Sequence, residues 1–177
     1  RAEGPRGPRP PAPPHPASRG WWRARGRATA GEGWAAVLAS GNERPPMAVR
    51  ANARRSTPEK VLAELEAAGI AGRRLDHDAI LLEHPVAVAR LPGFAEGRVS
   101  VQDAGAQWAA RLLAPRAGER VLDACAAPGG KTAHLLESAD IELLALELDP
   151  GRAQGIERNL ARLGLRAHGD CGPVGVR

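Results

Sequence analysis

The 177-residue sequence has no tyrosine, one phenylalanine and four tryptophans, so aromatic residues make up only 3% of it. A core must therefore be built from leucine, valine and alanine. No run of roughly 18 apolar residues is present, which excludes a membrane-spanning helix. The two cysteines, Cys125 and Cys171, are too few for a disulfide scaffold and lack the spacing of a metal site. The chain shows no signal-peptide pattern, so we expect a cytoplasmic protein that binds no metal.

Lysine is scarce too, because Lys60 and Lys131 are the only two, and arginine carries nearly all of the positive charge. A net charge of +5 suggests a nucleic-acid partner. However, residues 1–30 hold seven arginines against one glutamate, whereas residues 31–177 hold 18 basic and 19 acidic side chains. The foldable part of the chain is not basic, so the overall charge alone does not indicate RNA binding.

The N-terminal segment, residues 1–20, contains seven prolines by position 16 and shows no apolar periodicity. Such a segment buries too little surface to offset its ordering entropy, so we expect it to be disordered or partly polyproline II. Two interpretations stay open: a basic arm that contacts RNA, or an upstream extension without a role.

Residues 121–132, VLDACAAPGGKT, predict a strand, a tight turn and the start of a helix. Val121 and Leu122 end a short apolar run that is typical of a buried strand, and Asp123 follows at its carboxyl end. Small residues in the turn let the backbone approach a nucleotide-like ligand, at which the next helix points its N-terminus. Residues 141–146 predict a second buried strand. The acid that follows, Glu147, stands where the ribose hydroxyls of an adenosine are usually bound.

Spacing distinguishes the motif from two other nucleotide-binding patterns. The turn lacks the G-x-G-x-x-G pattern of a Rossmann dinucleotide fingerprint. Gly130, Lys131 and Thr132 match the end of a Walker A loop, but Cys125 replaces its first glycine. A closely approached backbone position tolerates cysteine poorly. A structural turn without any ligand is the simplest alternative.

The string DACAAPGGKT at residues 123–132 resembles motif I of the S-adenosylmethionine-dependent RNA cytosine-C5 methyltransferases. Three flanking segments are similar to the bacterial 16S ribosomal RNA methyltransferases of the B type: NERPPMAVRAN at 42–52, LPGFAEG at 91–97 and VSVQDAGAQ at 99–107. The resemblance extends over residues 21–166 and implies S-adenosylmethionine as cofactor and 16S ribosomal RNA as partner. The residues that it implies for cofactor binding are Cys125, Ala126, Ala127, Pro128, Gly129, Gly130 and Lys131 at the methionine end, Glu147 at the ribose and Asp170 at the adenine.

We expect an α/β chain in four parts, of which the first is set off by its composition and the other three are implied by the resemblance. These are the Pro/Arg-rich residues 1–20, a remnant of a helical domain at 21–45, a small α+β, RNA-recognition-like unit at 46–100, and an incomplete Rossmann-like class I methyltransferase sheet at 101–177. Within the third part no aromatic residue is placed to stack bases, so a packing module without RNA contact is an equal alternative. Sequence patterns predict strands at 46–50 and 79–83 and helices that begin near residues 58, 104 and 150.

Methyl transfer to C5 of cytosine needs a nucleophile at C6, because C5 of the neutral ring is too weakly nucleophilic. In the family a cysteine thiolate fills this role and a second cysteine helps release the product, both in motifs without a counterpart in this sequence. Cys125 lies in the cofactor turn and Cys171 in a glycine-proline tail, so we assign no catalytic residue. We expect a truncated methyltransferase that is inactive alone; the alternatives are a non-enzymatic RNA-binding fragment and a Walker-type nucleotide-binding module.

The sequence also predicts the exposure of an arginine row on the last helix and of one edge of the motif I strand. Arg158, Arg162 and Arg166 recur along one side of the last predicted helix, and such a row is typical of a solvated face. The motif I strand, residues 119–124, would lack a neighbour on one side if the sheet is incomplete. An open apolar edge of this kind favours association with other chains. We therefore expect an aggregated or molten fragment that binds S-adenosylmethionine weakly or not at all and that gains solubility and binding when the missing strands are supplied.

Overall fold

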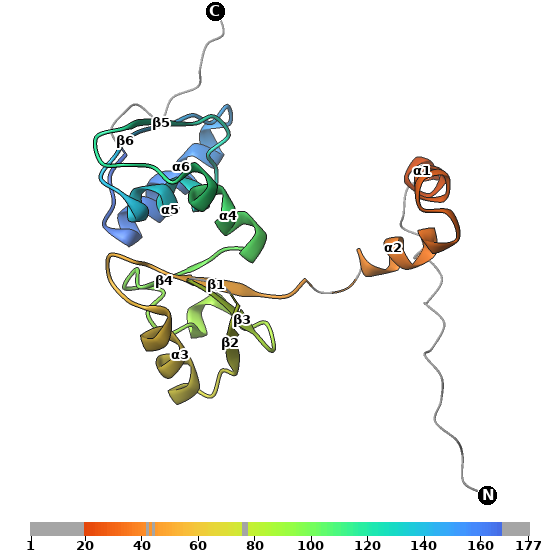
Figure 1. The fold of residues 1–177 in the computed structure, drawn as a ribbon, viewed down its shortest axis with the longest axis horizontal. Coiled ribbons are helices and arrows are strands. Elements are labelled where there is room, and N and C mark those ends of the chain that lie inside the picture. The colour runs from red at the N-terminus through yellow and green to blue at the C-terminus, as the bar shows by residue number, and fades with distance from the viewer. Residues whose placement is uncertain (1–19, 42, 44, 76–77, 168–177) are drawn as a thin grey trace, which may run out of the picture. The chain divides into compact units, whose positions relative to one another are not determined.

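The structure is a computed structural model that describes residues 20–41, 43, 45–75 and 78–167. The expectations for residues 1–19, for Asp170 and for Cys171 therefore fall outside the described residues. The chain divides into two compact units, with the boundary in the sequence between Pro45 and Pro46, and each unit is described by itself (Figure 1). No helix in the described ranges is long and apolar enough to cross a membrane.

The first unit is largely helical over its described residues. It contains α1 (Gly20–Ala30), a short 3-10 turn (Gly31–Gly33) and α2 (Trp34–Ser40). Helix α1 has no buried residue, and α2 buries only Leu38. Trp21 and Trp22 are 63% and 49% exposed, so these large rings contribute little to a core.

The second unit begins with a four-stranded antiparallel sheet in the order β2-β3-β1-β4. Alternate side chains of β1 serve two different faces: Val49 and Ala51 join a core with Val61 and Leu65 of α3, whereas Arg50 points to the opposite side. Helix α3 begins where the sequence predicts, because the Thr57 side chain accepts a hydrogen bond from the Lys60 N–H. The elements are β1 (Ala48–Ala51), α3 (Pro58–Ala67), β2 (Gly72–Arg74), β3 (Ala79–Leu82), a 3-10 turn (Val88–Arg90) and β4 (Val99–Val101).

Strand β4 modifies the expected division of the chain at residue 100. Its last residue, Val101, is the register partner of Val49 in β1. The antiparallel sheet therefore extends one residue beyond the proposed boundary, and Gln102 and Asp103 make the connection to the next helix. Asp103 caps that helix, since its carboxylate accepts a hydrogen bond from the Gly105 N–H.

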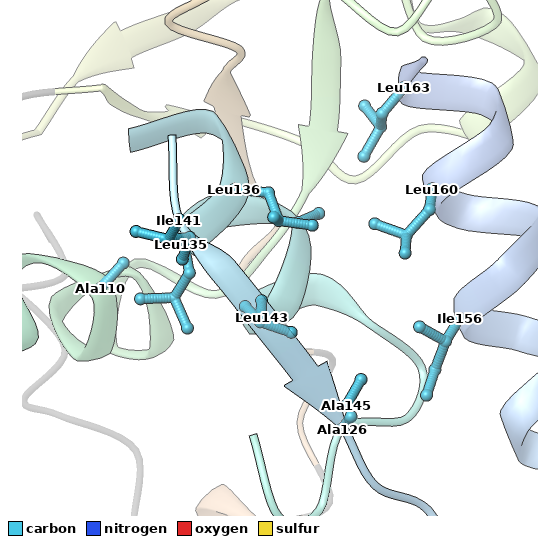
Figure 2. Close-up of a cluster of buried hydrophobic side chains, with 11 residues drawn as sticks. Ala110, Ala126, Leu135, Leu136, Ile141, Leu143, Ala145, Ile156, Leu160 and Leu163 are labelled. Atoms are coloured by element: carbon cyan, nitrogen blue, oxygen red, sulfur yellow. The ribbon is translucent and has the colours of Figure 1, made fainter. Parts of the chain in front are cut away.

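The rest of the unit is a βαβ arrangement that follows a preceding helix. It consists of α4 (Ala104–Leu113), β5 (Arg120–Asp123), α5 (Gly130–Ser138), β6 (Glu142–Ala145) and α6 (Pro150–Leu163). Strands β5 and β6 pair in parallel, with Leu122 opposite Leu144 and Asp123 opposite Ala145. Figure 2 shows the core, in which Ile156 and Leu160 of α6 face Leu143 of β6.

The prediction that the motif I strand is buried is wrong for the described residues. The strand forms as β5, but Leu122 is 58% exposed and its partner Leu144 is 40% exposed. In the described part of the chain β5 pairs with β6 alone, and the helices pack on the face that carries Leu143. The opposite face of the two strands has no covering layer there, so its leucines meet solvent.

Candidate cofactor site

The turn between β5 and α5 holds a backbone shape that favours glycine. Gly129 has φ +91°, and a Cβ there would lie 3.2 Å from Cα of Ile156 in α6. The Gly129 N–H donates to the Ala126 carbonyl at 2.7 Å, which closes the turn, and the Ala126 N–H donates to the Leu146 carbonyl at 3.0 Å. The turn is therefore hydrogen-bonded to Leu146, the residue that follows β6. A ligand bound at the turn would contact mainly the turn's backbone, because its side chains are small.

Thr132 anchors the start of α5 to the end of β5. Its hydroxyl donates to the Asp123 carboxylate at 2.7 Å, and the residue is fully buried. A Walker A loop needs this hydroxyl for a magnesium ion, so the bond to Asp123 disfavours that alternative. The N-terminus of α5 and the turn remain available for an anionic or polar ligand group, whereas Cys125 is exposed and carries a free thiol.

Glu147 lies against the turn, as the motif spacing predicts. Its carboxylate accepts hydrogen bonds from the Ala127 N–H at 3.3 Å and from the Asp149 N–H at 3.1 Å. Arg152 also donates to this carboxylate, at 3.2 Å, and to the Ala127 carbonyl at 3.2 Å. A carboxylate offers about four lone-pair positions, and three donors already occupy both oxygens of Glu147, whose side chain is 4% exposed. About one position is left for a ligand hydroxyl, on the oxygen that the Ala127 N–H contacts.

Arg152 and Asn159 are site residues that sequence reasoning missed. Arg152 joins Glu147 to the turn from the first turns of α6, and Asn159 donates from its side-chain amide to the Gly129 carbonyl at 3.3 Å. Arg152 could have been predicted from the sequence, because it follows Glu147 by only five residues. Asn159 gives no such signal, because its contact depends on how α6 packs against the turn.

A buried ion pair connects the antiparallel sheet to the helix that follows the turn. Arg50 of β1 donates to the Glu137 carboxylate of α5 at 2.8 Å, and both side chains are 1% exposed. Arg50 also donates to the Gln102 side-chain carbonyl at 3.1 Å. Burial lowers the pKa of Arg50 and raises the pKa of Glu137 to about 7, although the mutual attraction of the pair opposes both shifts.

The sequence expectation of a solvated arginine row is wrong for Arg162. Arg158 and Arg166 are exposed, whereas Arg162 is half-buried and its guanidinium donates to the carbonyls of Phe94 and Val99 at 2.6 and 3.0 Å. Helical periodicity placed Arg162 away from the apolar face of α6. The segment before β4 packs on that side, and its carbonyl groups bind the guanidinium.

The pKa of Glu137 gives a testable pH dependence. The carboxyl ionises near pH 4.5 when unperturbed and near pH 7 in the folded protein, so the folded state binds the extra proton between these values. This contribution to stability is complete below about pH 4.5 and is lost as the pH rises through about 7. In Glu137→Gln the effect is absent. We therefore expect the unfolding free energy of the wild type, relative to this variant, to fall by about 1.4 kcal/mol per pH unit across this window.

Urea unfolding of both proteins at several pH values between about 4.5 and 7 measures this difference. His134, whose pKa burial lowers to about 3, is present in both proteins, so its own contribution cancels. A difference that grows as the pH rises would show that Arg50 keeps Glu137 ionised throughout, which contradicts the prediction.

Solved structures establish the class of fold. A methyltransferase homolog protein from Pyrococcus horikoshii matches with a TM-score of 0.74 and 25% identity, over 85% of this chain and 51% of that one. NSun6 from Pyrococcus horikoshii, solved with the S-adenosylmethionine analogue SFG, has a TM-score of 0.73 at 15% identity, over 87% of this chain and 65% of that one. The fold is thus that of a Rossmann-like methyltransferase joined to a small α+β unit.

Sequence comparison then identifies the family. The model of a ferredoxin-like domain of RsmF/B-like methyltransferases matches residues 15–89, and the model of the 16S rRNA methyltransferase RsmB/F matches residues 110–172. The ribosomal RNA small subunit methyltransferase B of Shewanella oneidensis is 46% identical over 160 residues, which cover 88% of this chain and 37% of the relative. The chain belongs to the RsmB/F family of 16S ribosomal RNA methyltransferases. It spans little more than a third of that relative's length.

Proposed function

We propose that this chain carries the cofactor-binding part of an S-adenosylmethionine-dependent methyltransferase that acts on C5 of cytosine in 16S ribosomal RNA. The observation that carries the proposal is the turn of residues 125–131, whose Ala127 N–H is bonded to the Glu147 carboxylate and whose Gly129 packs closely on α6. Family membership supports both the cofactor and the RNA substrate. The cytoplasm, where ribosomal RNA is processed, is the compartment that this function implies.

The described residues fit the cofactor chemically. Backbone groups of Cys125, Ala126, Ala127, Gly129, Gly130 and Lys131, with the ring of Pro128, would surround its methionine end. Glu147 would accept a hydrogen bond from a ribose hydroxyl at the oxygen that Arg152 does not bind, where the Ala127 N–H is the donor already present. Asp170, the expected adenine contact, lies outside the described residues. When bound, S-adenosylmethionine supplies an electrophilic methyl group.

The nucleophile for C6 of cytosine is not assigned to this chain. Among the described residues Cys125 is the one cysteine, and it lies in the turn that would hold the cofactor. No base is bonded to its thiol there, and its place in the turn suits a backbone role. The part of the reaction that we assign to these residues is the binding and orientation of the methyl donor.

Calorimetric titration of the chain with S-adenosylmethionine tests the proposal. Glu147→Ala is expected to weaken binding by about 1.5–3 kcal/mol, as for the loss of hydrogen bonds to a charged group. The matched control is Glu142→Ala at the start of β6, which removes the same charge at an exposed position and should leave the affinity unchanged. Equal affinities of the wild type and Glu147→Ala would show that Glu147 does not hold the ribose.

A further inference from the structure

The Gly129 carbonyl is held in place from two directions. It accepts the first hydrogen bond of α5, from the Ala133 N–H at 2.9 Å. It also accepts a hydrogen bond from the Asn159 side-chain amide at 3.3 Å, and Asn159 belongs to α6. The cofactor turn is therefore fixed by a side chain that lies beyond its own βαβ loop.

The orientation of the Asn159 amide is itself determined by a neighbour. Arg162 donates to the Asn159 side-chain carbonyl at 2.9 Å. An arginine has donors only, so it must face the oxygen end of the amide, and the nitrogen end is left to donate to Gly129. Without Arg162 the amide would lose the contact that selects this orientation.

Arg162 is positioned in turn by the antiparallel sheet unit. Its guanidinium donates to the Phe94 and Val99 carbonyls at 2.6 and 3.0 Å and to the Ser100 hydroxyl at 3.2 Å, and it lies 4.0 Å from the centre of the Phe94 ring. The two parts also approach closely in their backbones, because a Cβ at Gly97 would lie 2.7 Å from the Arg162 carbonyl. A displacement of residues 94–100 would therefore displace Arg162.

We propose that Arg162 and Asn159 are positioning residues that couple residues 94–100 to the cofactor turn. Residues 94–100 lead into β4 and belong to the antiparallel sheet unit of residues 46–101, which we call the ferredoxin-like unit because the ferredoxin-like family model matches residues 15–89. The series runs from the Phe94 and Val99 carbonyls to Arg162, then to Asn159 and the Gly129 carbonyl. Coupling between two places is reciprocal, so a contact that moves residues 94–100 changes cofactor affinity, and cofactor binding restrains that segment. The inference rests on the proposed function and adds a route by which the ferredoxin-like unit regulates the site.

Three variants of the 177-residue chain test the series: Asn159→Ala, Arg162→Ala and the double variant. The first measurement is hydrogen exchange of the backbone amides in residues 126–134 without cofactor. Each single variant is expected to exchange about 3- to 10-fold faster there, as for the loss of one hydrogen bond. The second measurement is the affinity for S-adenosylmethionine, which should fall by a similar factor.

The arrangement in series makes a sharper prediction for the double variant. If Arg162 acts on the turn through Asn159, Arg162→Ala should have no further effect on cofactor affinity once Asn159 is alanine. A general packing role would instead give additive losses, and additivity would overturn the proposal. Arg158→Ala is the matched control, because Arg158 is an exposed arginine on the same helix, and it should leave both measurements unchanged.

The two measurements separate this inference from the proposed function. If the wild-type chain does not bind S-adenosylmethionine, the proposed function fails, and the exchange rates still report whether the series holds the turn. If the wild type binds and the single variants bind equally well, the coupling is refuted. Unchanged exchange in residues 126–134, together with a lowered melting midpoint, would likewise overturn it.

Discussion

Replacing Arg50 by alanine is expected to lower the unfolding free energy by about 3–5 kcal/mol at about pH 8. At this pH the Glu137 carboxyl, whose pKa is about 7, is ionised in the folded protein. The pair is 1% exposed on both sides, and Arg50 lowers the pKa of Glu137 against the effect of burial. Removal of the arginine therefore forces the buried carboxyl either to stay ionised without its counter-charge or to take up a proton at a pH where the unfolded chain does not, and it also leaves the Gln102 carbonyl without its donor. Chemical denaturation of the two proteins measures the cost.

A double-mutant cycle isolates the pair itself. Arg50→Met with Glu137→Leu replaces the ions by apolar side chains of similar volume, and such replacements of buried pairs are often neutral. The double variant should therefore be more stable than Arg50→Met alone. Arg120→Ala is the control, since Arg120 pairs with Glu142 on the surface and its loss should cost less than about 1 kcal/mol. Equal costs for Arg50 and Arg120 would contradict the buried-pair account.

Elements with local signals were predictable from the sequence. Helix α3 has a capping threonine, a proline in its first turn and apolar residues at helical spacing, and helix α6 has Asp149 as cap and Pro150 after it. Strand β2 was missed because its three residues, Gly-Arg-Arg, show no apolar alternation. Strand β2 forms because its backbone pairs with β3, so the residues that determine it belong to β3 and not to β2 itself.

The candidate site was predictable only where its residues are set by the βαβ spacing. The turn and Glu147 follow from that spacing, and the structure brings them together through the Ala127 N–H. The Arg50–Glu137 bond joins residues 87 positions apart, and the Arg162–Phe94 bond joins residues 68 apart. No local pattern encodes such contacts, because they depend on how the ferredoxin-like unit packs against α5 and α6.

The exposed face of β5 and β6 is expected to cause self-association. Leu122 and Leu144 are register partners, so their exposed side chains form one continuous apolar surface. Parallel strands are normally covered on both faces, and such surfaces on soluble proteins usually mark contacts with other protein. We expect sedimentation velocity to show dimers or larger species whose proportion rises with protein concentration.

Lysine substitution of both leucines should reverse this association. Full burial of one leucine contributes about 1.5–3 kcal/mol, so Leu122→Lys with Leu144→Lys should raise the dissociation constant by about a hundredfold or more. The matched control is Leu75→Lys with Val88→Lys, which adds the same charge at two exposed apolar residues of the same unit that lie outside β5 and β6, and it should leave association unchanged. If the wild type sediments as a monomer at every concentration, the face is not an association surface. If both lysine pairs disperse the oligomers equally, charge alone explains the effect, because the control pair leaves the β5–β6 face intact.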